Sequence, residues 1–175
     1  VKNESCFGIE DGSITVNPPL TGLEFKLNNL PWTTNGVFGN LKPGTYTVQV
    51  RDAESCIASF PHIIAPGQKL SFAAFSITCN NSGTLSNAND DVYNIVLNVS
   101  ADPVSSNTYT VRYNNVVVGS TYTLGIVSNF SLPADGSSGV LEVTDNVTGC
   151  KISRDIGPLT SCSTDCDISI SNLQV

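Results

Sequence analysis

The sequence has few cationic side chains and no methionine. Its 175 residues include 8 Lys and Arg against 15 Asp and Glu, which gives a formal net charge of −7, and the cationic residues form no cluster. Binding to a nucleic acid depends on Lys and Arg side chains that displace the counterions of the phosphates. We therefore expect no nucleic-acid partner.

Long apolar runs are also absent. No stretch approaches the about 18 apolar residues that a membrane-spanning helix needs, so the sequence predicts no membrane span. The chain begins at Val1 and shows no signal peptide. We expect it to be a processed or excised piece of a longer protein.

The motifs of common catalytic sites are missing too. The chain contains no Gly-x-Ser-x-Gly nucleophile elbow, no paired-carboxylate signature and no Gly-rich phosphate loop. Its one histidine, His62, follows Pro61 in a segment expected to be an edge strand. The sequence therefore predicts a protein that is not an enzyme and has no cofactor, apart from the calcium considered below.

What the sequence does contain is the two-residue alternation of β-strands. Tyr46, Val48 and Val50 fall on one face of a strand, and the polar residues between them fall on the other. Helical periodicity is absent over any useful length. Further strands are predicted at 14–16, 23–27, 55–64, 70–79, 92–100, 108–113, 116–118, 122–127, 140–144 and 151–156, with turns at 114–115 and 135–139.

One frame occurs twice along the chain. Each copy has a cysteine, a polar Gly-rich loop, short strands, and a final strand that ends in an Asp shortly before a second cysteine. The copies run from Cys6 to Asp52 and Cys56, and from Cys79 to Asp145 and Cys150. The repeat predicts modules at residues 1–66 and 67–160, followed at 161–175 by a linker and the opening strand of a further module. The predicted fold class is all-β, with tandem immunoglobulin-like Greek-key β-sandwich modules stapled by disulfides.

The six cysteines supply the expected staples. A core of about 65 residues rarely provides more than about 3–5 kcal/mol, so a covalent link is expected. The frame favours Cys6 with Cys56 and Cys79 with Cys150, each worth about 4 kcal/mol in the chain-entropy model. Cys162 and Cys166 then remain for each other. The alternative joins Cys79 to Cys162 and leaves Cys150 for Cys166.

The cysteines also indicate the compartment. Disulfides over long loops belong to the cell exterior or the periplasm, because the cytosol keeps thiols reduced. A zinc site would need close pairs of ligands, and Cys162 with Cys166 is the only such pair, far in sequence from His62. We therefore expect an extracellular protein with disulfides in place of zinc.

Three motifs of the first module occur together: Cys6-Phe7-Gly8, Asp-Gly-Ser-Ile-Thr-Val at 11–16, and Leu-Lys-Pro-Gly-Thr-Tyr-Thr-Val-Gln-Val-Arg-Asp-Ala-Glu-Ser-Cys at 41–56. They resemble the repeat of SprB-type gliding-motility adhesins, very large cell-surface proteins of Bacteroidota. Ser55 departs from the Gly usual in that repeat, and residues 23–32 lack its Gly-Gly-x-x-Pro-Tyr run. The second module resembles, more loosely, immunoglobulin-like modules of the same surface proteins.

The resemblance implies export by the type IX secretion route, a position on the bacterial cell surface, and a role in cell adhesion as a stalk or adhesive segment. The expected partners are neighbouring modules of the same chain, surface polysaccharide and other protein subunits. Two alternatives stay open. One is a carbohydrate-binding or accessory module of a secreted protein, and the other is a subunit of an extracellular filament that docks by strand addition through residues 168–175.

An acidic loop is the candidate metal site. Asp90 and Asp91 supply the hard oxygen ligands that calcium prefers. Asp135 and Asp145 lie in other loops that are expected to approach this one, the Asp135 loop at the same pole of the sandwich. A solvated loop with capped turns is the competing interpretation.

Two aromatic residues are candidates for specific roles. The hydroxyl of Tyr46, after Pro43-Gly44, is placed to tie a sandwich corner to nearby backbone. Trp32 is either a core residue, as a single tryptophan of a small domain usually is, or an exposed platform for a sugar ring.

Overall fold

All of the regular structure in the described residues is β-strand. The computed structural model describes residues 1–17, 21–84, 87 and 89–162, and within them it contains strands and turns but no helix. The chain divides into unit 1, Val1–Lys69, and unit 2, Leu70–Val175. The all-β prediction is confirmed, and the division falls close to the predicted end of the first module at residue 66.

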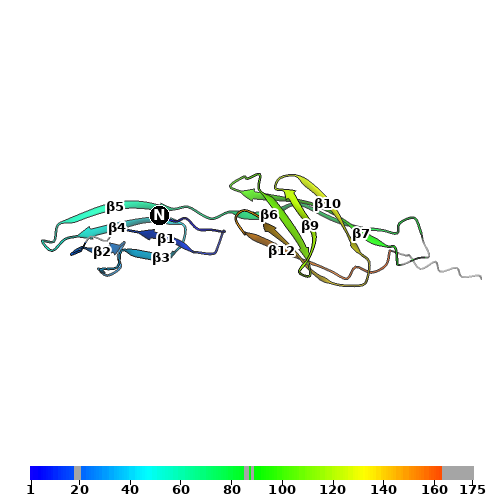
Figure 1. Ribbon diagram of the computed structural model, residues 1–175, viewed down its shortest axis with the longest axis horizontal. Helices are drawn as coiled ribbons and strands as arrows, with labels where there is room; N and C mark the ends of the chain where they lie inside the picture. Colours follow the sequence, from blue (N-terminus) through cyan, green and yellow to red (C-terminus); the bar gives the residue numbers. More distant parts are fainter. Residues whose placement is uncertain (18–20, 85–86, 88, 163–175) are drawn as a thin grey trace, which may run out of the picture. The chain divides into compact units, whose positions relative to one another are not determined.

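The part of unit 1 that the structure describes forms five strands in two antiparallel sheets, and Figure 1 labels them. The strands are β1 (Gly12–Thr15), β2 (Glu24–Leu27), β3 (Val37–Leu41), β4 (Gly44–Arg51) and β5 (Ile57–Ile64). One sheet pairs β1 with β3, and the other has the order β2-β4-β5. Ile14 of the first sheet packs against Val48 and Ile64 of the second, so the two sheets enclose one small core.

The described residues of unit 2 form seven strands in two further sheets. The strands are β6 (Lys69–Asn80), β7 (Val92–Asp102), β8 (Thr108–Tyr113), β9 (Val116–Thr123), β10 (Val127–Pro133), β11 (Gly139–Asp145) and β12 (Lys151–Ile156). The sheet orders are β10-β7-β6 and β12-β11-β8-β9.

The core of unit 2 follows the alternation of its strands. Alternate residues of β7, β8 and β11 are buried, among them Ile95, Leu97, Val99, Tyr109, Val111, Tyr113, Leu141 and Val143. The Tyr109 hydroxyl donates a hydrogen bond of 3.1 Å to Oγ of Ser128 on β10, which satisfies the buried phenol and links the two sheets.

The turns explain where the predicted strands were right and wrong. Asn114 and Asn115 both have positive φ, 48° and 68°, as a two-residue hairpin turn requires, so the predicted turn is confirmed. The strand predicted at 122–127 is wrong. Gly125, with φ of 80°, lies in a turn that separates β9 from β10.

Candidate functional site

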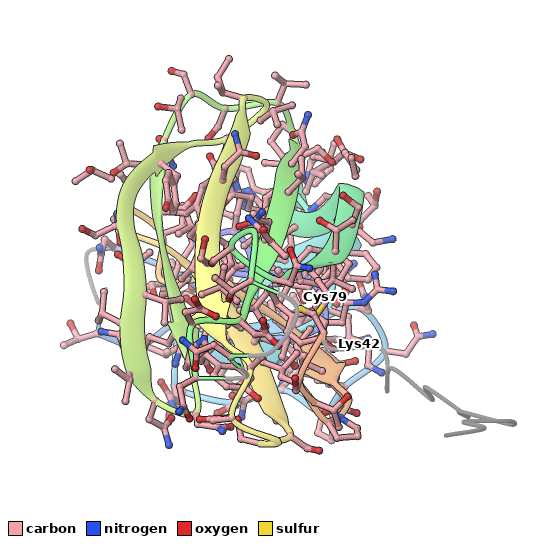
Figure 2. The ribbon with its side chains drawn as sticks, turned by 90° about the vertical axis from the view of Figure 1, so that its right-hand side faces the viewer. Lys42 and Cys79 are labelled. Carbon is pink, nitrogen blue, oxygen red and sulfur yellow. A yellow bond between two sulfur atoms is a disulfide. The ribbon has the colours of Figure 1, made fainter. Side chains whose placement is uncertain are left out.

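A disulfide closes unit 2. Cys79, near the end of β6, is bonded to Cys162, which follows β12, with the two Cα atoms 5.6 Å apart (Figure 2, where Cys79 is labelled). The predicted bond from Cys79 to Cys150 is therefore wrong, because Cys150 lies at the opposite end of β12. The first half of the alternative pairing, Cys79 with Cys162, is confirmed, and Cys166 lies outside the described residues.

The predicted bond within unit 1 is also wrong. Cys56 is a free, exposed thiol, whereas Cys6 and Cys150 are disulfide-bonded. Cys56 precedes β5, and Cys6 lies beside Gln68, beyond the other end of β5. The eight residues of that strand separate the two cysteines by about 26 Å, far beyond the reach of a disulfide.

Disulfides still mark the environment of the protein. They persist where thiols are not kept reduced. The Cys79–Cys162 bond therefore indicates a non-reducing compartment of the extracellular kind.

The repeated Asp and Cys of the frame form a turn in each unit. The Asp52 N–H donates to the Cys56 carbonyl at 3.3 Å, and the Asp145 N–H donates to the Cys150 carbonyl at 2.9 Å. The residue before each cysteine has positive φ, 67° at Ser55 and 75° at Gly149. The frame thus encodes a hairpin turn between two strands, and the cysteine spacing within it does not indicate a bond.

The C-terminal segment of unit 1, residues 65–68, is hydrogen-bonded to the N-terminal segment of the same unit. The Glu4 N–H donates to the Ala65 carbonyl and the Phe7 N–H to the Gln68 carbonyl, at 3.3 and 3.1 Å. The Ala65 N–H in turn donates to Oδ1 of Asn3 at 3.0 Å. Residues 65–68 are therefore fixed to residues 3–7 of the same unit.

Glu4 holds this arrangement together from a buried position. Its carboxylate accepts hydrogen bonds of 2.9 Å from the N–H groups of Gly67, Glu10 and Gly8. These bonds, that from Gly67 foremost, lower the pKa of Glu4. A Cβ on Gly67 would lie 2.6 Å from the Cys6 backbone, so only glycine fits where the two segments meet.

The predicted calcium ligands have protein partners. Oδ2 of the buried Asp91 accepts hydrogen bonds of 2.7 Å from the Ser161 hydroxyl and the Cys162 N–H, while its Oδ1 is buried without a hydrogen bond in the described residues. The Asp90 carboxylate accepts from the Thr84 hydroxyl at 2.8 Å. Asp91 thereby anchors the segment that carries the disulfide.

Asp135 caps its own turn. The hydroxyl and the N–H of Ser137 lower the pKa of Asp135. The neighbouring Ala134 N–H donates to the Asp91 carbonyl at 3.1 Å, so the two loops do share a pole. Within the described residues no three His, Cys, Asp or Glu side chains are grouped to hold a metal ion, and calcium binding stays a prediction.

Asp145 does not belong to this pole. It is fully buried at the end of β11, where it accepts hydrogen bonds from Asn107 Nδ2 at 3.1 Å and from the N–H groups of Val147 and Thr148 at 2.8 and 3.0 Å. Asp135 precedes the start of the same strand. The whole length of β11 therefore lies between them, and the approach considered from the sequence is wrong.

The predicted role of Tyr46 is confirmed. Its hydroxyl donates a hydrogen bond of 2.9 Å to the backbone carbonyl of Lys42, four residues upstream. This bond fixes the corner at which the chain enters β4.

Trp32 lies outside the core of unit 1. Its half-buried ring lies 4.4 Å from the Arg51 guanidinium and 5.7 Å from Lys26 Nζ, measured to the ring centroid. Both cations project from the face of the β2-β4-β5 sheet opposite the core. The core interpretation of Trp32 is therefore wrong.

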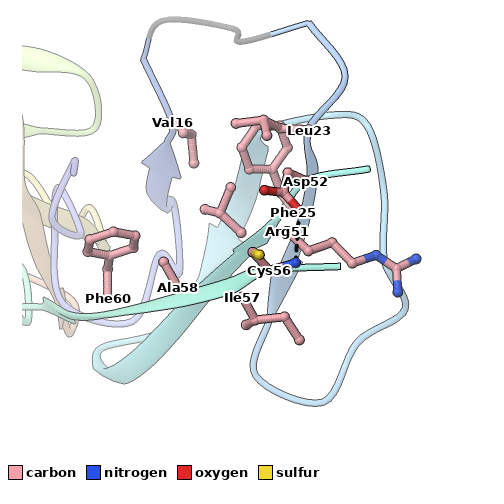
Figure 3. Close-up of a pocket in the computed structure, with 10 residues that line it drawn as sticks. Val16, Leu23, Phe25, Arg51, Asp52, Cys56, Ile57, Ala58 and Phe60 are labelled. Carbon is pink, nitrogen blue, oxygen red and sulfur yellow. Dashed lines mark hydrogen bonds between the residues drawn. The ribbon is translucent and has the colours of Figure 1, made fainter. Parts of the chain in front are cut away.

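An apolar pocket of 430 Å³ opens at one end of unit 1 (Figure 3). Val16, Phe25, Val50 and Phe60 contribute to its lining, and the Cys56 thiol lies among them. Phe60 faces the same side as its Cα partner Val48 but is 49% exposed. In the described residues the core of unit 1 is thus open at this end.

The described part of the chain holds no helix with the length and apolar character that a membrane crossing requires. Comparisons of the chain with protein-family models, curated proteins and solved structures found no match.

Proposed function

We propose that this chain is an extracellular structural and adhesive segment of a large bacterial surface protein of the gliding-adhesin type, with no enzymatic activity. The observation that carries the proposal is the disulfide from Cys79 to Cys162, 83 residues apart. The loop that it closes contains six of the seven strands described in unit 2. A covalent bond that closes so long a loop suits a module that bears load.

The Cys79–Cys162 disulfide changes the route that a pulling force takes through unit 2. Tension on the ends of unit 2 passes from Cys79 through the two sulfur atoms to Cys162. The strands β7 to β12 lie inside the loop and carry little of that tension. Unit 2 therefore keeps its fold under loads that break the hydrogen bonds outside the loop.

The C-terminal segment of unit 1 supports the same role. Residues 65–68 are hydrogen-bonded to residues 3–7, and Glu4 accepts the Gly67 N–H. A segment fixed in this way bends less than a free Pro-Gly linker. A stalk built from such modules transmits force with little slack.

The strand order of unit 2 supports an immunoglobulin-like sandwich. In chain order its first, second and fifth strands form one sheet, and the third, fourth, sixth and seventh form the other. Immunoglobulin-type sandwiches divide seven strands between two sheets in a similar way. Here the fourth strand, β9, pairs with the third, as happens when that strand changes sheets.

Single-molecule pulling tests the mechanical role. The chain from Cys79 to Cys162, a sequence separation of 83, spans about 27–30 nm when extended, so the oxidised chain should extend by at least about 27 nm less than the reduced chain. A Cys56→Ser background prevents cross-linking between molecules through the exposed thiol. Equal extension with and without reductant would contradict the proposal.

The Cys79→Ser/Cys162→Ser variant is the matched control. In reductant it should extend as far as the parent chain, because neither carries the bond. A difference between the two in reductant would show that the substitutions alter the fold, and the comparison would then be made with Ala in place of Ser.

A filament subunit is the second candidate. The edge strand β5 exposes Ile57, Phe60 and Ile63, an apolar edge to which another strand can add. Residues 168–175, the expected donor, lie outside the described residues. This candidate requires polymers of the purified chain visible by electron microscopy, and their loss on Phe60→Lys.

A further inference from the structure

The outer face of the β2-β4-β5 sheet, defined as the side opposite the core, is polar and uncovered by the described strands. Phe25, Leu27 and Val48 point toward the core and are buried. The residues that alternate with them on β2 and β4 therefore point outward, namely Glu24, Lys26, Thr45, Thr47, Gln49 and Arg51.

Backbone pairing holds Trp32 at this face. The Thr33 N–H donates to the Phe25 carbonyl at 2.9 Å, and the Phe25 N–H donates to the Thr33 carbonyl at 2.7 Å. The chain after β2 thus returns alongside β2, and the indole lies over Arg51 at 4.4 Å. Glu24 fixes Arg51 through an ion pair of 2.6 Å, so the ring rests on an ordered support.

A polar groove lies next to the ring. It has a volume of 550 Å³ and is lined by Lys26, Asn28, Asn29, Thr47 and Gln49. Lys26 also lies 5.7 Å from the Trp32 ring, so it joins the groove to the indole. Every lining side chain can donate or accept a hydrogen bond.

Some of the hydrogen-bonding groups that line the groove have no partner among the described residues and are available to a ligand, as Asn28 and Gln49 illustrate. Oδ1 of Asn28 accepts the Thr47 N–H at 2.8 Å, which leaves the Asn28 amide nitrogen as a donor. Nε2 of Gln49 donates to the Ser59 hydroxyl at 3.3 Å, which leaves the Gln49 amide oxygen as an acceptor. The groove therefore offers a ligand both hydrogen-bond donors and hydrogen-bond acceptors.

This set of groups matches a polysaccharide. An indole packs against the apolar face of a sugar ring, and amides pair with its hydroxyls. Arg51 is already paired with Glu24, whereas Lys26 makes no ion pair among the described residues, so its ammonium is suited to a carboxylate. We propose that the outer face of the β2-β4-β5 sheet is a binding site for a polysaccharide that contains uronic acids.

The site goes beyond the mechanical role and does not depend on it. Its residues lie in unit 1, outside the loop that the Cys79–Cys162 bond closes. The Cys79→Ser/Cys162→Ser variant therefore keeps Trp32 and its hydrogen-bonded surroundings in place. Failure of one proposal would leave the other standing.

Tryptophan fluorescence tests the site directly, because Trp32 is the only tryptophan in the chain. The whole chain is titrated with polygalacturonate and, separately, with dextran of similar size. Polygalacturonate should change the emission in a saturable way, with an affinity at least tenfold higher than that for dextran. Unchanged emission with polygalacturonate would overturn the proposal.

Variants separate the contributions, with binding followed by calorimetry and folding by circular dichroism. Trp32→Ala and Gln49→Ala should each weaken binding at least fivefold, and Lys26→Gln should remove the preference for the acidic polymer. Lys69→Gln is the matched control, since Lys69 lies over Phe7 outside the groove and its loss should leave affinity unchanged. Binding that survives Gln49→Ala and Lys26→Gln, or that falls equally with Lys69→Gln, would overturn the proposal.

Discussion

At the scale of the residue, single side chains stabilise unit 1 through hydrogen bonds to backbone groups. Tyr46 reaches the Lys42 carbonyl and Glu4 gathers three N–H groups. The first contact was predictable, because a Tyr soon after Pro-Gly at the start of a strand is typical of a sandwich corner. The second was not, because the partners of Glu4 come from segments that meet only in the folded chain.

Tyr46→Phe should destabilise unit 1. The substitution removes the hydroxyl that donates to Lys42 and keeps the ring, so we expect a loss of about 0.5–1.5 kcal/mol in the free energy of unfolding. Urea unfolding followed by Trp32 emission measures it. Tyr113→Phe is the control, since the Tyr113 hydroxyl lies 3.4 Å from Ser137 in unit 2 and its loss should not change this transition.

Glu4→Gln should weaken unit 1 at neutral pH and flatten its response to acid. Hydrogen bonds lower the pKa of Glu4 from its ordinary 4.5, and Lys2 lowers that of Asp11 to about 2. A carboxyl whose pKa is lower in the folded state stabilises the fold above its unfolded pKa and loses that effect as pH falls through the folded value. Stability of the parent chain should therefore decline from about pH 5 toward pH 2.

Urea midpoints at pH 7, 4 and 3 measure this decline. Glu54→Gln, at an exposed turn position, is the control and should follow the parent chain at every pH. A parent chain with equal midpoints at pH 7 and pH 3 would contradict the assigned role of Glu4.

At the scale of the element, the repeated sequence frame corresponds to a repeated hairpin turn between two strands. The turn from Asp52 to Cys56 and the turn from Asp145 to Cys150 share the same backbone bond and the same positive φ before the cysteine. A residue other than glycine is strained in that conformation. Unit 1 has Ser55 at the position where unit 2 has Gly149.

Substitution of Ser55 by Gly and of Gly149 by Ser should change the stability of the two units in opposite directions. Ser55→Gly should stabilise unit 1 by up to about 1 kcal/mol, and Gly149→Ser should destabilise unit 2 by about 1 kcal/mol. No atom lies within 4 Å of a Cβ built on Gly149, so the second effect comes from the backbone alone. Thermal unfolding of each single variant against the parent chain measures both, and effects of equal sign would contradict the argument.

The elements were predicted where one face is buried and alternation is regular. The strand β8 begins and ends where the sequence predicts, because its apolar residues alternate without interruption. The strand β12 also has the predicted bounds, although Arg154 interrupts its alternation. β3 was missed because Gly39 interrupts its alternation and Asn40 has a φ of 54°. Only its pairing with β1 makes that segment a strand.

At the scale of the molecule, the cysteine pairing depended on distances that the sequence does not contain. The repeat suggested bonds between equivalent positions, but the strand lengths place Cys6 and Cys56 at opposite ends of β5. The location of Trp32 was equally hidden, since it follows from the return of the chain along β2 through Thr33. Local patterns thus predicted the class of fold and left its long-range contacts open.

Removal of the Cys79–Cys162 bond should destabilise unit 2 far more than unit 1. For a loop of 83 residues the chain-entropy model gives about 4.5 kcal/mol, so Cys79→Ser/Cys162→Ser should raise hydrogen exchange of the β7 and β8 amides by more than 100-fold. Trp32 emission, which monitors unit 1, is the internal control. Exchange in β7 that matches the parent chain would contradict this prediction.

The same bond has a consequence for survival among secreted proteases. A cut anywhere between residues 80 and 161 leaves both products tied through sulfur to Cys79 and Cys162. The severed strands therefore remain together and can reassemble, and whatever lies farther along the polypeptide stays tethered after the damage.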